Sequence, residues 1–331
     1  MSFFDDLRRA IVKGFFLFLI LIPLVVAFLT NPEFESSTAR PTDRLKEASS
    51  QDLERHVRQL ASISPARNFR NQQSLSRAGE YIKKVWSDQG YVVTSQRFEA
   101  GGATYENLIV TVGPEDAPSR IVVGAHYDVH EEQPGADDNA SGVAGLLELT
   151  RLMKPRTPSD KRIDFVAYTT EEPPFFGTNQ MGSAVHAESL LPEKAKIKLM
   201  ISLEMIGYFS DQPNSQNFPV PSLKYLYPNV GNFIAVIGNP KSWMVTRQVK
   251  TLMRSRASIP VESLNAPGRF PGVGLSDHVN YWHRGIPAVM ITDTAMFRND
   301  NYHKETDTPD TLDFGRMAEV VNGVLGVLTE L

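Results

Sequence analysis

Histidines and carboxylates stand directly after several apolar segments of this sequence. His126 and Asp128 follow RIVVGA, Glu171 and Glu172 follow RIDFVAYTT, and Glu204 follows IKLMISL. Ligands in an open α/β sheet bind beyond the carboxyl ends of the strands, so side chains at these positions are placed to meet. The chain contains no cysteine, which leaves histidine and carboxylate as its metal ligands. The pattern therefore predicts a divalent-metal site.

The residues around His126 and Asp138 favour metal binding over their ordinary structural roles. His126 and Asp128 are two positions apart on an extended segment and so point the same way. A carboxylate beside a histidine is the usual partner that fixes the imidazole for metal binding. One acid at Asp137–Asp138 would suffice to cap the apolar helix expected from Ser141, whereas two adjacent carboxylates repel each other unless a cation lies nearby. Asp138 is therefore predicted to be shared by two metals.

The remaining candidates for the metal site are Glu171, Glu172, Glu204 and His303. Where a strand turns into a loop, both glutamates of the Glu171–Glu172 pair can reach one cavity, one as a ligand and the other as a general base; an exposed acidic turn is the alternative. Glu204 interrupts the apolar run MISLEMIGYF, and a buried carboxylate must be paired or metal-bound. His303 lies in a polar loop and, taken alone, would be a surface histidine.

The candidates carry more weight as a set than singly. Two histidines and three carboxylates suit zinc or another divalent ion. With one carboxylate shared, five ligands can hold two ions at the spacing that two-metal hydrolases use. The predicted metal ligands are His126, Asp138, Glu172, Glu204 and His303.

Alternating strands and helices must position these side chains. Apolar or alternating runs predict strands at 92–100, 106–113, 120–128, 162–172, 197–209, 233–239 and 287–294. Helical spacing predicts helices at 53–63, 76–90, 142–154, 241–255 and 314–331. This order predicts a single-domain, three-layer α/β/α fold around a mostly parallel mixed central sheet. An apolar fraction of 41% and a charged fraction of 22% are ordinary for a globular protein.

The amino-terminal segment predicts a membrane anchor. Residues 14–29 are uncharged and almost wholly apolar, and with the four preceding residues they approach the roughly 20 needed to cross a bilayer. Arg8, Arg9 and Lys13 precede the run, which predicts a cytoplasmic amino terminus. A cleaved signal peptide and a buried core helix are the alternatives; the first lacks a small-x-small cleavage pattern, and the second lacks a polar face.

These boundaries divide the chain into three parts. Residues 1–30 are the predicted cytoplasmic terminus and transmembrane signal-anchor, 31–45 a polar linker, and 46–331 the α/β domain that carries the predicted metal site. The domain is expected to be extracytoplasmic, in a periplasmic or extracellular space. The net charge of −4 gives no reason to expect nucleic acid. The sequence leaves the oligomeric state open.

Six motifs of the sequence resemble, in this order, those of the co-catalytic zinc aminopeptidases typified by secreted bacterial leucyl and Streptomyces aminopeptidases: GAHYD, PGADDNASGVAGLLE, TTEE, LEMIGY, SDHVNYWHRGIPAVMITDT and NYHKETDTPDTLD. Glutamate carboxypeptidase and glutaminyl cyclase are more distant relatives. The resemblance runs from about Leu53 to the carboxyl terminus. It implies that His126 and Glu204 bind one zinc ion, Glu172 and His303 the other, and that Asp138 bridges them.

The resemblance also implies the catalytic residues. Glu171 matches the general base, Asp128 the partner of His126, and Tyr302 a tyrosine that in some members polarises the scissile carbonyl. The block Ser276-Asp277-His278 matches a recurrent motif near the site, for which we expect a structural histidine and no catalytic role.

Two departures from the family pattern concern metal number and specificity. Many of these aminopeptidases carry aspartate where this chain has Glu204, and glutaminyl cyclases of this fold bind a single zinc ion through such a glutamate. Residues 173–177, PPFFG, replace the usual glycine-leucine approach, so a different specificity pocket is expected.

The expected activity is hydrolysis of peptides at a free amino terminus, with two zinc ions and Glu171 as general base. A single-zinc enzyme that cyclises amino-terminal glutamine is one alternative. A catalytically silent membrane receptor of the same fold is another, although a binding module has no need of Glu171.

Overall fold

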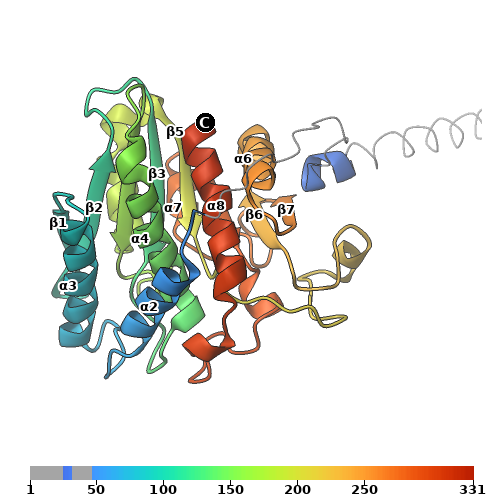
Figure 1. The fold of residues 1–331 in the computed structure, drawn as a ribbon, viewed down its shortest axis with the longest axis horizontal. Helices are drawn as coiled ribbons and strands as arrows, with labels where there is room; N and C mark the ends of the chain where they lie inside the picture. The colour runs from blue at the N-terminus through green and yellow to red at the C-terminus, as the bar shows by residue number, and fades with distance from the viewer. Residues whose placement is uncertain (1–24, 32–46) are drawn as a thin grey trace, which may run out of the picture.

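The computed structural model describes residues 25–31 and 47–331, and its eight described strands form one sheet (Figure 1). Across the sheet they follow the order β1-β2-β4-β3-β5-β8-β6-β7. Their bounds are β1 Thr94–Ala100, β2 Ala103–Val112, β3 Arg120–His126, β4 Arg162–Tyr168, β5 Ile197–Leu203, β6 Ile234–Gly238, β7 Val261–Asn265 and β8 Ala288–Thr292.

The central strands β4, β3, β5 and β8 run parallel. Antiparallel pairing joins β2 to β1 and β4, and β6 to β8, while β7 runs parallel to β6. The carboxyl ends of the four central strands therefore meet at one edge of the sheet. The predicted mixed α/β sheet is confirmed. Strand β7, VESLN, was not predicted, because five residues with three polar side chains give too short an apolar alternation.

Helices cover both faces of the sheet (Figure 1). Ile121 and Val123 of β3 face the larger apolar cluster, whereas Val122 faces a second cluster on the other side. The larger cluster receives α2 Ser50–Ala61, α3 Gln72–Asp88, α4 Gly142–Met153, α6 Trp243–Arg256 and α8 Phe314–Glu330; the second receives α5 Gly182–Ser189 and α7 His278–His283. Strand β3 is thus buried on both faces, as its continuous apolar run requires.

The predicted anchor and linker lie mostly outside the described residues. Within the described part, residues 25–30 are helical, and no helix there is both long and apolar enough to span a bilayer. Asn31 is buried, with 2% of its surface exposed, and its side-chain amide donates to the Ser263 hydroxyl at 3.3 Å. The chain at residue 31 is therefore packed against the α/β domain.

Because β3 carries His126 and is buried on both faces, its packing should govern the stability of the domain. We expect Val123→Ala to lower the free energy of unfolding by about 2 kcal/mol, since the side chain is fully buried. Val92→Ala is the matched control: the same methyl groups are removed from a side chain that is 88% exposed, so its effect should be near zero. Urea unfolding would measure both. Equal midpoints for the two variants would contradict this account of the core.

Candidate metal centre

His126 ends β3 and faces two carboxylates from different parts of the chain. Its Nε2 lies 3.4 Å from Asp138 Oδ1 and 3.4 Å from Glu204 Oε2. Glu204 directly follows β5, which pairs with β3, and Asp138 lies in the turn before α4. The three side chains are buried. The parallel pairing of β3 and β5 therefore places two of them side by side, and the turn brings in the third.

The other oxygen of Asp138 faces the second histidine. His303 Nε2 lies 3.1 Å from Asp138 Oδ2 and 3.5 Å from Glu172 Oε1. Glu172 follows β4, and His303 comes from the loop between β8 and α8. One carboxylate thus stands between two histidine–glutamate pairs, with a separate oxygen directed to each histidine.

The spacing of these atoms suits zinc. Around a tetrahedral ion with bonds of about 2.0–2.1 Å to nitrogen or oxygen, neighbouring ligand atoms lie about 3.3 Å apart. The ligand–ligand distances at both histidines are 3.1–3.5 Å. Ligand atoms of His126, Asp138 and Glu172 also lie within 4.8 Å of one another. The nitrogen and oxygen donors present are those that zinc takes in the absence of cysteine.

The acids of this cluster are buried together, and burial disfavours their ionised form. Burial, and then the neighbouring Asp138 carboxylate, raises the pKa of Glu172 to about 7. Burial also raises the pKa of Glu204. For Asp138 burial acts in the same direction, but the two histidines outweigh it and lower its pKa. A cation among these groups would stabilise all three carboxylates in their charged form.

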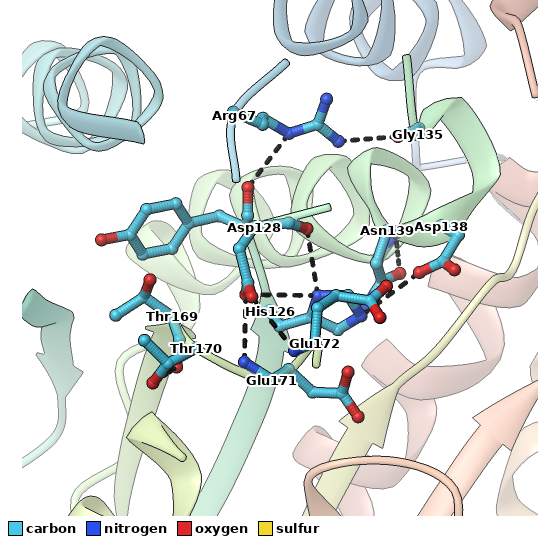
Figure 2. A network of polar contacts seen from close by, with 12 residues as sticks. Arg67, His126, Asp128, Gly135, Asp138, Asn139, Thr169, Thr170, Glu171 and Glu172 are labelled. Atoms are coloured by element: carbon cyan, nitrogen blue, oxygen red, sulfur yellow. Dashed lines mark hydrogen bonds and ion pairs between the residues drawn. The ribbon is translucent and has the colours of Figure 1, made fainter. Parts of the chain in front are cut away.

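Asp128 fixes both the histidine and the glutamate pair (Figure 2). Its backbone carbonyl lies 3.2 Å from His126 Nδ1, and its Oδ1 lies 3.5 Å from the same atom. Its carboxylate also accepts from the backbone N–H groups of Glu171, at 3.2 Å, and Glu172, at 3.1 Å. The predicted contact with His126 is present, and the hold on the Glu171–Glu172 turn is a second role that the sequence did not indicate.

Glu171 is placed beside the metal-ligand candidates. The side chain is 6% exposed, and Figure 2 shows it next to Glu172 beneath the His126 ring. Burial raises the pKa of its carboxyl well above the ordinary value, and the carboxylates of Glu172 and Glu204 add to the effect, while His126 opposes it. An acid with a raised pKa is suited to receive and release a proton near neutral pH.

Sequence reasoning missed three residues that hold the ligands. Asp307 accepts from the backbone N–H groups of Asp137, at 2.9 Å, and Asp138, at 3.1 Å. The Asn139 side chain donates to the Leu203 carbonyl at 2.9 Å and accepts from Met205 N. The Ser276 hydroxyl donates to Glu204 Oε2 at 2.8 Å. Two of them carried a signal: Asp307 follows His303 in the same polar loop, and Ser276 belongs to the block Ser276-Asp277-His278, although its contact with Glu204 was not predicted.

His278 has a structural environment, as expected from the sequence. Its Nε2 donates to the Val273 carbonyl at 2.8 Å, and its ring meets Trp282 edge-on. Burial lowers its pKa to about 4, so the ring is neutral at physiological pH.

An apolar cavity opens beside Glu204 and Tyr302. Its floor is formed by residues of β6, β7 and β8, and its apolar lining includes Ala235, Ile237, Leu264, Met290, Val273 and Phe297. The PPFFG loop does not line this cavity: Phe175 instead packs edge-on against Phe69 and Tyr105. The expected effect of this loop on specificity stays a prediction.

Tyr302 stands between the metal-ligand candidates and the cavity. Its ring stacks on that of His303, with centroids 3.8 Å apart. The His130 ring stacks on His303 as well, at 4.0 Å and nearly parallel. Two rings at such distances cannot share one face of an imidazole without overlapping, so His303 is held between them. Burial raises the pKa of Tyr302, which keeps its hydroxyl protonated.

The chain is similar to an uncharacterized bacterial protein and to probable aminopeptidases. It is 44% identical over 330 residues to the uncharacterized protein YfbL of Escherichia coli K12, covering 97% of this chain and 99% of that protein. It is 26% identical over 268 residues to a probable leucine aminopeptidase of Arthroderma otae, covering 76% of this chain. The match spans only 64% of that fungal protein.

Solved structures share the fold. The aminopeptidase LapA of Legionella pneumophila superposes with a TM-score of 0.68 at 18% identity, over 89% of this chain and 76% of that one. A glutaminyl cyclase of Bacteroides thetaiotaomicron gives 0.65 at 18% identity, over 86% of this chain and 99% of that one. At these identities the likeness concerns the fold.

The family model described as "Peptidase family M28" matches residues 107–328, which contain every candidate ligand named above. The resemblance predicted from the motifs is confirmed, and the chain belongs to peptidase family M28.

Proposed function

We propose that this protein is a zinc-dependent aminopeptidase that removes amino acids from the free amino terminus of peptides. The position of Asp138 carries the proposal. Its two oxygens are directed to His126 and His303, and each histidine has its own glutamate, Glu204 or Glu172. This arrangement offers two three-ligand sets that share one carboxylate, as two-metal hydrolases require.

Bound zinc would supply Lewis acidity, polarising the scissile carbonyl and lowering the pKa of the attacking water. Glu171 accepts the proton of that water as the new carbon–oxygen bond forms. The same carboxyl then donates the proton to the leaving amine as the carbon–nitrogen bond breaks. Asp128 supports both steps because it holds the backbone of Glu171 and of the neighbouring ligand Glu172.

Tyr302 is placed to assist the carbonyl oxygen. Its hydroxyl is protonated, its ring is fixed against His303, and it lines the cavity beside Glu204. Negative charge develops on the carbonyl oxygen during attack, and a fixed O–H donor stabilises that charge. In this role Tyr302 lowers the free energy of the transition state by donating a hydrogen bond to the carbonyl oxygen.

The cavity suggests which substrates are preferred. An aminopeptidase must hold the side chain of the first residue next to its metal ligands. The lining of Ala235, Ile237, Leu264 and Met290 is apolar, so burial of a leucine-sized side chain there is favourable. We therefore propose a preference for large apolar amino-terminal residues.

Cyclisation of amino-terminal glutamine by a single zinc ion is the second candidate. Glu204 in place of aspartate favours it, as does the similarity in fold to a glutaminyl cyclase. Against it, His303 and Glu172 stand beside Asp138 in the same way that His126 and Glu204 do.

We further propose that the amino-terminal segment before residue 25 anchors the enzyme in a membrane and that the active site is extracytoplasmic. The apolar run at 14–29 and the basic residues before it support this proposal. Residues 25–31, predicted to end the anchor of residues 1–30 and to begin the linker of residues 31–45, instead pack against the domain.

Replacing the proposed base tests the mechanism. We expect Glu171→Gln to retain the parent zinc content while kcat falls by about 10²–10⁴-fold, because the amide cannot accept the proton. Hydrolysis of leucyl p-nitroanilide and metal analysis of the same samples would measure both quantities. Hydrolysis at the parent rate would remove Glu171 from this role.

Metal stoichiometry tests the shared carboxylate. We expect two zinc ions per parent chain, and one in His303→Ala, because His126, Asp138 and Glu204 form a complete set without His303. His283→Ala, which removes a histidine outside the candidate site, should keep two. One ion in the parent, together with ammonia release from a glutaminyl peptide, would instead support the cyclase.

Filling the cavity tests the proposed specificity. Ala235 lies on the cavity floor, is 4% exposed, and is not a candidate ligand. We expect Ala235→Leu to reduce kcat/KM for leucyl substrates by about 10-fold or more, since added methylenes take the space of the substrate side chain. Alanyl substrates should be affected much less. An equal loss for both would show that the first side chain binds elsewhere.

A further inference from the structure

The helical residues 25–30 lie against α6 and β7, beside the domain edge (Figure 1). The Asn265 amide donates to the Phe28 carbonyl at 2.9 Å, and the Ser263 hydroxyl donates to the Thr30 carbonyl at 3.1 Å. The Phe28 ring meets that of Trp243 in α6, with centroids 6.0 Å apart. Five residues of segment and domain thus form a packed contact.

The domain side of this contact is made of buried polar groups. Lys250, Ser263 and Asn265 are at most 3% exposed. The Lys250 ammonium donates to the Thr30 carbonyl at 3.0 Å. Buried polar groups are costly without hydrogen-bond partners, and here carbonyls of the segment supply them. A tether that only connects a domain to something else would need no such contacts.

Strand β7, which carries Ser263 and Asn265, also lines the apolar cavity. Glu262, Ser263 and Leu264 of β7 all line it. Glu262 is paired with Lys250 at 3.3 Å, and Ser263 binds Thr30, so two of the three lining residues are connected directly or through one side chain to the segment. Strand β7 itself pairs only with β6 among the described strands.

We propose that residues 25–31 are a structural part of the substrate pocket. By fixing Lys250 and Ser263, this segment holds β7 in place and sets the shape of the cavity that receives the first side chain of the substrate. It therefore contributes to the preference for large apolar amino-terminal residues. The inference rests on the proposed aminopeptidase function, and adds a determinant of specificity that lies outside the α/β domain.

The test uses the full chain and alters only the segment. In the double variant Phe28→Ala/Asn31→Ala, the ring contact with Trp243 and the amide contact with Ser263 are lost, while every cavity-lining and metal-ligand residue is unchanged. Val25→Ala is the matched control, because Val25 belongs to the same helical segment and is 53% exposed.

Two measurements are compared across the parent, the double variant and the control. The first is the ratio of kcat/KM for leucyl over alanyl p-nitroanilide, which we expect to fall about tenfold in the double variant, mainly through KM for the leucyl substrate. The second is amide hydrogen exchange in residues 261–265, which should become faster. Zinc content should equal that of the parent, and Val25→Ala should match the parent in every respect.

The outcomes separate this inference from the proposed function. Faster exchange in β7 with an unchanged leucyl-to-alanyl ratio would overturn it, as would unchanged exchange in the double variant. If the zinc-loaded parent hydrolyses neither substrate, the proposed aminopeptidase function fails by itself. Hydrogen exchange then decides whether the segment holds β7.

Discussion

The arrangement of the site depends on the crowding of buried carboxylates at the carboxyl ends of three neighbouring parallel strands. Glu172 follows β4, His126 ends β3 and Glu204 follows β5, while Asp138 reaches them from the turn before α4. Burial disfavours the charge on each acid, and proximity disfavours it further. Such a cluster stays ionised in a folded protein only where positive charge compensates it.

Two further carboxylates, Asp128 and Asp307, fix the loops that carry the ligands by binding their backbone N–H groups. Asp128 binds the N–H groups of the Glu171–Glu172 turn, and Asp307 binds those of Asp137 and Asp138. In both cases one carboxylate accepts from two consecutive amides, so it fixes the direction of a loop. At Glu172 and Asp138 these hydrogen bonds fix the backbone that carries the ligand without involving the ligand side chain.

The sequence predicted the layers and the gathering of side chains at one sheet edge because both arise from local periodicity. The apolar run at 120–125 must be a strand buried on two faces, and the residues directly after it must lie at the sheet edge. The clamp from Asp307 to Asp137 could not be predicted, since it joins positions 170 residues apart. The packing of Phe175 could not be predicted from its neighbours in the sequence either, because its aromatic partners Phe69 and Tyr105 come from distant segments.

The two outer strands of the sheet are protected in different ways. Strand β1 presents exposed polar and charged residues, TSQRFE, which discourage pairing with another sheet. Strand β7 has no such charge pattern, but the Tyr227 hydroxyl occupies the Ser263 carbonyl at 2.7 Å, and residues 28–31 cover the side chains beside it. The Tyr227 hydroxyl therefore takes one backbone carbonyl of this strand, and the amino-terminal segment packs on the side chains next to it. A strand edge whose backbone groups are engaged in this way offers less of a template for another chain.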